Sequence, residues 1–149
     1  MEVIAIGTVR SPVAEPVDEG WGSVVAEIVL APDLAEGLRG LENFSHALVV
    51  FFMHRAAFDL RSDLVRHPQG RTDLPLSGIF AQRAKHRPNP IGITVVRVIA
   101  REGNVLRVEG LDAIDGTPVL DVKPYFPQYD RAEDPRLPAW VSEIMRGYF

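Results

Sequence analysis

The chain has 149 residues, of which 46% are hydrophobic and 24% charged, a profile typical of one globular domain with a buried core. It contains no cysteine, which excludes disulfides, a thiolate nucleophile and a cysteine zinc site and favours a reducing compartment. It has neither a basic leader nor an apolar run near the roughly 20 residues of a membrane helix. We therefore expect a single domain spanning 1–149, cytoplasmic and without a membrane anchor.

Charge is distributed unevenly along the chain, although the net charge is only −4. Residues 1–50 carry 2 basic and 8 acidic side chains, residues 51–101 carry 9 and 3, and residues 102–149 carry 5 and 9. The middle third is therefore positive and can attract an anionic ligand. The alternative is that this third forms ion pairs with the two acidic ends.

The first half of the chain alternates strand-forming segments with turns. An acidic loop, 14–22, carries Trp21, for which packing at the edge of the core is favoured over a place in a binding site. A short amphipathic helix is expected at 34–38, after a proline that helices tolerate in their first turn. The predicted strands of this half span 3–10, 23–30 and 44–53, the last being the most apolar and therefore central.

The second half begins with a mixed segment, 55–76, which we interpret as a mobile loop of the length that often forms a lid. Apolar residues at helical spacing in 140–149 predict a helix that packs against the strands or a partner chain. About seven short strands in all, with two small helices, predict a mainly β fold, either a small barrel or a sandwich. The strands predicted in this half span 78–82, 93–101, 105–109 and 119–125.

A cationic loop lies between two of these strands, in the stretch 78–92. Three cations and a histidine occupy five positions, and the turn Pro88-Asn89-Pro90 follows at once. Proline fixes its own φ and favours an extended residue before it, so Arg87 and Asn89 should be extended and the loop stiff. Such a loop suits an anionic or polar ligand, whereas the simpler interpretation is a solvated charged turn. The three cations are Arg83, Lys85 and Arg87, and the histidine is His86.

Motifs for metal or hydrolytic chemistry are weak. The histidines show no metal-binding spacing, and neither a phosphate-binding loop nor a nucleophile elbow occurs. Three aspartates in the last third offer carboxylates for a hydrolase or magnesium site. A turn accounts for one of these aspartates, however, and an ion pair with Lys123 or the cationic loop accounts for another. The histidines are His46, His54, His67 and His86, and the aspartates are Asp112, Asp115 and Asp121.

Several stretches, considered together, resemble the TsaA/TrmO-like family. Ile-Gly-x-Val-Arg-Ser-Pro occupies 6–12, and Gly-Leu-x-x-Phe-Ser-His occupies 40–46. Arg-Pro-Asn-Pro-Ile-Gly follows at 87–92, Asp-Gly-Thr-Pro at 115–118 and Lys-Pro-Tyr at 123–125. The resemblance covers nearly the whole chain, and the 87–92 and 115–118 motifs together make it specific.

The resemblance implies a single-sheet β-barrel with short peripheral helices that binds S-adenosylmethionine, usually as a homodimer. It also implies methylation of the exocyclic amine of N-threonylcarbamoyl-adenosine beside the anticodon of tRNA. An arginine at such a site can bind the cofactor carboxylate bidentately, and an aspartate can accept from its ammonium group or a ribose hydroxyl. The cofactor positions implied by the motifs are His54, Arg55, Arg83, Ile93, Asp115, Gly116, Thr117 and Pro118.

The remaining residues of the cationic loop are then expected to contact tRNA phosphate or the modified base. No general base is assigned, and Asp121 and His86 are the weak candidates. No metal is expected. The predicted substrate-binding residues are Lys85, His86, Arg87 and Asn89.

The sequence departs from the family pattern in three places. Longer bacterial members carry an added C-terminal domain, many members have phenylalanine where His86 stands, and the segment 16–21 is acidic where the family pattern is basic. These departures weaken the tRNA assignment more than the cofactor assignment. The alternatives are a non-catalytic S-adenosylmethionine-binding or sensing barrel, a methyltransferase with another acceptor, and a metal-dependent hydrolase using the aspartates.

Overall fold

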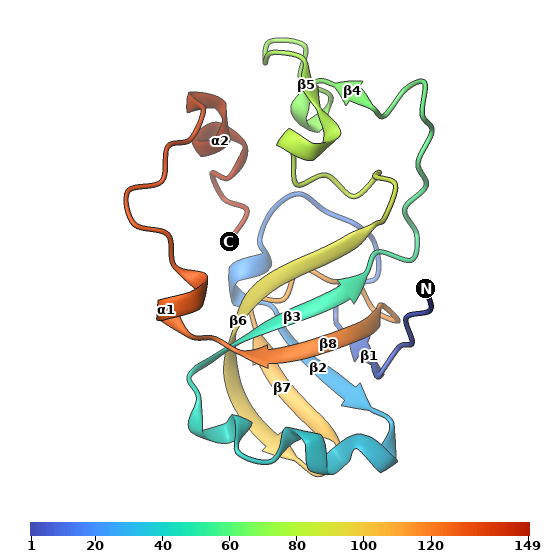
Figure 1. Cartoon of the computed structure of the whole chain (residues 1–149), viewed down its shortest axis with the longest axis vertical. Coiled ribbons are helices and arrows are strands. Elements are labelled where there is room, and N and C mark those ends of the chain that lie inside the picture. The colour runs from blue at the N-terminus through green and yellow to red at the C-terminus, as the bar shows by residue number, and fades with distance from the viewer.

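The structure, a computed structural model, describes all residues 1–149 and is built on a closed barrel of six antiparallel strands (Figure 1). The strand order is β1-β2-β7-β6-β3-β8, and β8 pairs with β1 to close the sheet. A mainly β, single-sheet barrel with short peripheral helices is therefore confirmed. The strands are β1 (Gly7–Arg10), β2 (Val25–Leu30), β3 (His46–Phe52), β6 (Ile91–Glu102), β7 (Val105–Glu109) and β8 (Pro118–Pro124).

The core lies inside the barrel because strand residues alternate between the two faces of the sheet. In β2, for example, Ala26, Ile28 and Leu30 are buried while the residues between them are only partly covered. Fifteen buried residues from all six strands and their connections form one apolar cluster. Closure of the sheet gives every strand two hydrogen-bonded neighbours, so the backbone bonds and the core support one another.

The barrel has two different ends. Between β2 and β3, the 3₁₀ helices η2 (Pro32–Leu38) and η3 (Leu41–Asn43) cover one end, and each contributes a leucine to the core. Figure 1 shows these turns below the barrel. The helix predicted at 34–38 is thus present, but as a 3₁₀ helix that begins at Pro32. At the other end, which we call the site end, the connection 110–117 between β7 and β8 contributes Leu111 and Ala113 to the core.

Residues 53–90, which we call the lobe, connect β3 to β6 beyond the site end (Figure 1). Two very short strands, β4 (Val65–Arg66) and β5 (Ser77–Gly78), pair with each other within it. The strand predicted at 78–82 is wrong for most of its length, because Ile79–Ala81 forms the 3₁₀ turn η5. The loop predicted at 55–76 contains β4 and the 3₁₀ turn η4 (Pro68–Gly70).

The C-terminal segment returns to the lobe and to the N-terminal loop. It contains the short helices α1 (Pro127–Asp130) and α2 (Ala139–Ile144), so the helix predicted over 140–149 is shorter than expected. Trp21, in the 3₁₀ turn η1 (Trp21–Ser23), is only 2% exposed, and its backbone N–H donates to Tyr148 O at 2.8 Å. Trp21 therefore lies buried beneath the chain end, outside the barrel cluster. None of the helices is long and apolar enough to cross a bilayer.

Candidate ligand site at one end of the barrel

The strand pairing brings the three groups of predicted site residues to the same end of the barrel. β3 runs antiparallel to both β6 and β8, with Phe52 opposite Ile91 and Phe51 opposite Val119. The residues that follow β3, the cationic loop before β6 and the turn before β8 therefore all emerge at the site end. These segments are far apart in sequence, and the barrel topology alone makes them neighbours.

The N-terminal loop connects two of these groups. Arg55 donates to Ala14 O at 3.2 Å and forms an ion pair with Glu15 at 2.8 Å. Its guanidinium lowers the pKa of the Glu15 carboxyl by hydrogen bonding and by charge, and the same contact raises the pKa of Arg55. Asp115 accepts from Ser11 N–H at 3.0 Å and donates its own N–H to Val13 O at 2.8 Å. Residues 11–15 thus connect Arg55 to Asp115.

The turn before β8 has the conformation that its sequence predicts. Gly116 has φ of 78°, a left-handed value that side chains disfavour, and its N–H donates to Val9 O at 2.9 Å. Thr117 is almost completely buried, whereas Asp115 and Gly116 are exposed and Pro118 begins β8. Of the Asp115 carboxylate only Oδ1 is used, which leaves Oδ2 available to a ligand.

A groove of about 580 Å³ lies between the lobe and the start of β6. Arg83 donates to Ile93 O at 2.5 Å, and Arg87 Nη1 donates to Gln82 O at 3.2 Å. Neither guanidinium has a carboxylate partner, whereas the lobe's Arg66 pairs with Asp63 at 3.1 Å. Two guanidinium groups in this groove are therefore available to bind an anionic ligand. Its lining residues are Phe80, Gln82, Arg83, Arg87, Pro88, Asn89, Ile91 and Ile93.

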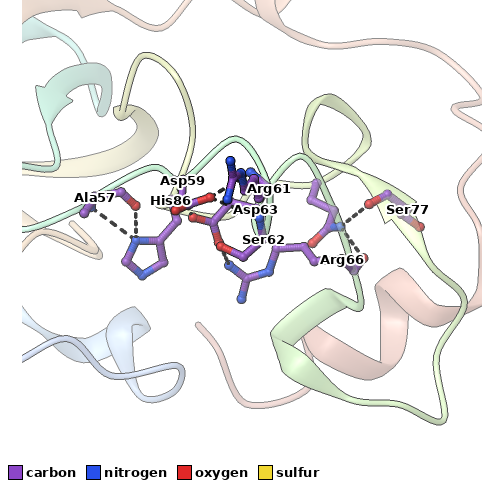
Figure 2. Close-up of polar contacts among 9 residues, drawn as sticks. Ala57, Asp59, Arg61, Ser62, Asp63, Arg66, Ser77 and His86 are labelled. Atoms are coloured by element: carbon purple, nitrogen blue, oxygen red, sulfur yellow. Dashed lines mark hydrogen bonds and ion pairs between the residues drawn. The ribbon is translucent and has the colours of Figure 1, made fainter.

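His86 fixes the cationic loop to the facing part of the lobe. Its Nδ1 lies 2.6 Å from Ala57 O and 3.2 Å from Ala57 N, so a proton on Nδ1 donates to the carbonyl and leaves Nε2 free. Figure 2 shows this contact beside the cluster in which Asp59 accepts from Arg61 N–H at 2.7 Å. One predicted substrate contact thus holds its own loop in place.

Gln82 is a residue whose role the sequence analysis missed. It is buried, and its Nε2 donates to Arg66 O at 2.9 Å and to Ser77 O at 2.8 Å. A buried amide needs such partners because an unsatisfied one is costly. Gln82 therefore joins the lobe's small sheet to the start of the cationic loop. Its sequence signal was weak, namely one amide in an otherwise apolar stretch before the loop.

A second missed group is centred on Asp112, in the connection that covers the site end. Its Oδ1 accepts from Thr94 Oγ1, and its Oδ2 accepts from Tyr148 OH at 2.7 Å. The pKa of Tyr148 is raised above its ordinary value, mainly by burial and then by the charges of Asp112 and Asp18, against which Arg83 acts. The chain end is thus hydrogen-bonded to the connection that leads into β8, and the charge of Arg83 reaches it. Nothing in the sequence spacing indicated these contacts.

The remaining predicted residues are less central. His54 is exposed just beyond β3, and Lys85 is exposed in the cationic loop. Asp121, a weak catalytic candidate, forms the expected ion pair with Lys123 at 2.5 Å on β8 and does not line the groove. The structure gathers no group of three or more His, Asp or Glu side chains that could hold a metal ion. The aspartates proposed for a hydrolase are instead engaged separately, by Thr94 and Tyr148, by Ser11 and by Lys123.

The closed barrel, with its cationic groove and glycine turn at one end, defines a known class of protein. The chain belongs to the family described as the tRNA-methyltransferase O N-terminal domain, whose model matches residues 11–131. The family assignment made from the motifs is therefore confirmed.

Two curated proteins and one solved structure illustrate the relationship. A probable S-adenosyl-L-methionine-binding protein of Pyrococcus abyssi is 40% identical over 143 residues, which cover 93% of this chain and 74% of that protein. The human tRNA (adenine(37)-N6)-methyltransferase is 39% identical over 97 residues, covering 65% of this chain and 22% of its own. The crystal structure of TrmO from Pseudomonas aeruginosa matches with a TM-score of 0.72 at 36% identity, over 91% of this chain and 60% of that one.

Proposed function

We propose that this protein is an S-adenosylmethionine-dependent methyltransferase that acts on the exocyclic amine of threonylcarbamoyl-adenosine beside the anticodon of tRNA. One observation carries the proposal. A groove lined by arginines without carboxylate partners and a glycine-containing acidic turn lie at the same end of a TrmO-type barrel. The names of the relatives support it, since they include S-adenosylmethionine-binding proteins and tRNA adenine methyltransferases.

The residues present fit this cofactor. Its carboxylate would be held by Arg83, because that guanidinium has no carboxylate partner and lies in the groove. Its ammonium or ribose hydroxyl would be held by the free Oδ2 of Asp115, and the backbone at Gly116 can be approached closely because no side chain intervenes. We propose the same cofactor contacts for His54, Arg55, Ile93, Thr117 and Pro118.

When bound, S-adenosylmethionine supplies an activated methyl group on a sulfonium. The protein's contribution is orientation of the acceptor amine in line with that methyl group, an effect that can contribute on the order of 7–11 kcal/mol. The lobe provides the acceptor contacts, namely Lys85, His86, Arg87 and Asn89. Of the two weak candidates for a general base, His86 has no hydrogen-bond partner at Nε2, whereas Asp121 is paired with Lys123. A tRNA substrate would place the reaction in the cytoplasm.

The charge distribution supports a nucleic-acid substrate. The lobe, residues 53–90, carries 7 basic and 3 acidic side chains on an otherwise acidic chain. Such a concentration of positive charge attracts a polyanion to one end of the molecule.

We also propose a single domain over 1–149 that forms a homodimer, because the outer face of β6 exposes apolar side chains such as Val95 and Ile99.

The first experiment measures binding of S-adenosylmethionine by calorimetry. We expect Arg83→Ala to weaken binding about 10- to 150-fold, as loss of a charged hydrogen bond of about 1.5–3 kcal/mol predicts. Arg39→Ala, at the opposite end of the barrel and paired there with Glu36, is the matched control and should leave affinity unchanged. Absence of any binding heat in the unaltered protein would overturn the proposal.

The second experiment follows transfer of labelled methyl from S-adenosylmethionine to tRNA that either carries or lacks threonylcarbamoyl groups. We expect label only in the first. Cofactor binding without transfer to either tRNA would instead support a non-catalytic cofactor-binding barrel. Transfer to both would indicate a methyltransferase with a different acceptor. Sedimentation of the wild type against Val95→Asp tests the homodimer.

A further inference from the structure

Phe80 is an exposed aromatic residue at the edge of the groove, and its neighbours in the chain are anchored. It is 76% exposed, although it lies in the turn η5 between Ile79, which is completely buried, and Gln82, which is also buried. Ile79 N–H donates to Leu64 O at 2.9 Å, so the turn is anchored on both sides of the ring. Together with Ile91 and Ile93, which are also exposed in the same groove, this ring on an anchored backbone forms an apolar surface suited to binding.

The surroundings of Phe80 show which ligand suits it. The same groove is lined by Arg83 and Arg87, and neither has a carboxylate partner. Other arginines near this end are neutralised, for example Arg55 by Glu15 and Arg71 by Asp73. An exposed ring beside uncompensated guanidinium groups matches a ligand that combines a flat, apolar ring with a negative charge, as a nucleotide does.

We infer that Phe80 is the surface on which a base of single-stranded RNA stacks while Arg87 contacts an adjoining phosphate. Arg87 uses Nη1 to donate to Gln82 O at 3.2 Å and Ala84 O at 3.5 Å, so Nη2 and Nε remain available to phosphate oxygens. Asn89, on the same wall, presents an amide that can pair with a base edge. The inference rests on the proposed function and adds to it a residue that none of the motifs indicated.

A second protein surface is a poorer match for this groove. Covering Phe80 with an apolar partner would also remove water from Arg87 and leave its charge uncompensated, which is costly. A phosphate-bearing ligand compensates that charge while it covers the ring. This difference in charge compensation favours RNA over a protein partner, although apolar residues such as Ile91 and Ile93 line the same groove.

The test measures the affinity of the full chain for a fluorescein-labelled, short single-stranded RNA by anisotropy, with S-adenosylmethionine affinity measured in parallel. Since stacking on an aromatic ring contributes about 1–3 kcal/mol per base, we expect Phe80→Ala to weaken RNA binding about 5- to 150-fold. Phe80→Tyr, which keeps a flat ring, should bind almost as well as the wild type. Phe80→Leu, which keeps apolar area without the ring, should bind almost as weakly as Phe80→Ala.

Tyr129→Ala is the matched control, because Tyr129 is 86% exposed on α1, outside the groove. Two RNA-binding results would overturn the inference, namely unchanged affinity in Phe80→Ala or wild-type affinity in Phe80→Leu. A lower molecular mass of Phe80→Ala than of the wild type in sedimentation would also overturn it, because the ring would then pack against another protein chain. Because Phe80→Tyr and Phe80→Leu are conservative, poor folding of the alanine variant leaves the comparison intact. If the wild type did not bind S-adenosylmethionine, the proposed methyltransferase function would be refuted. RNA binding that requires the aromatic ring at position 80 would still support stacking there.

Discussion

The barrel and the lobe are ordered in different ways, although they are joined through β3 and β6. In the barrel, each strand is hydrogen-bonded to two neighbours around a shared cluster of fifteen buried residues. In the lobe, a sheet of two two-residue strands and the loops beside it are held by single contacts, such as those of Gln82 and His86. The barrel is therefore stabilised collectively, whereas the lobe depends on a few contacts that can be removed one at a time.

The largest expected effect comes from making the same substitution, isoleucine to alanine, in each of the two regions. Ile28 in the barrel and Ile79 in the lobe are both completely buried. Ile28→Ala should lower the free energy of unfolding of the whole chain by about 2–5 kcal/mol, because it opens a cavity inside the closed sheet. Denaturant titration followed by tryptophan fluorescence and by far-ultraviolet circular dichroism measures the change.

Ile79→Ala should instead act locally. We expect a smaller change in global unfolding and faster amide hydrogen exchange in the lobe, notably at Gln82, whose N–H donates to Ile79 O at 3.2 Å. Exchange at β2 and β7 should not change. Equal global destabilisation by the two substitutions would show that lobe and barrel unfold as one unit and would contradict the comparison.

Gly92 marks the boundary between the two regions, and its substitution should have the next largest effect. A Cβ there would lie 2.3 Å from the ring of Phe51, a core residue, so Gly92→Ala forces that ring to move. Overpacking of this kind typically costs about 1–3 kcal/mol. Gly37→Ala is the control, because Gly37 has open space around it and no left-handed φ. Thermal unfolding of the two variants measures the difference, and equal stabilities would contradict the expected clash.

The smallest expected effect concerns the chain end. Tyr148→Phe removes the hydrogen bond to Asp112, and we expect a loss of about 1 kcal/mol in the free energy of unfolding near neutral pH. Because the folded state raises the pKa of Tyr148, it holds this proton more tightly than the unfolded state does. The stabilisation is therefore fully present below the ordinary pKa of 10.0 and is lost as pH rises above it.

Denaturant titrations at a series of pH values from neutral to above 10 test this prediction, since the ordinary pKa of tyrosine is 10.0. The difference between wild type and Tyr148→Phe should shrink as the pH rises above that value, because only the wild type loses the proton. A difference that stays constant across the series would show that folding does not raise the pKa of Tyr148.

Much of the barrel could be predicted from the sequence because its signals are local. Alternating burial appears as alternating hydrophobicity in 105–109, and Asp115-Gly116 predicts the turn that the structure shows. The lobe was predicted less well because its order comes from contacts that leave no local pattern. The stretch 78–82 contains strand-forming residues, but the burial of Ile79 and the bonds of Gln82 turn it into a 3₁₀ turn.

The candidate site shows the same division. The motifs indicated the cationic loop and the glycine turn, and the topology brings them to one end of the barrel. They did not indicate that Glu15 neutralises Arg55, nor that Tyr148 reaches Asp112, because these pairs are separated by 40 and 36 positions in the chain. Pairings at such separations depend on the folded geometry and not on spacing.

The double engagement of Asp112 has a consequence for how ligand occupancy could be observed. One carboxylate joins β6, through Thr94, to the chain end, through Tyr148, within the connection that leads to Asp115. Any displacement of that connection should be transmitted to the tail. Because the chain has no cysteine of its own, a single cysteine introduced at the exposed Met145 could carry a dye without competing reactions. Fluorescence of that dye would then report ligand binding at the site end of the barrel.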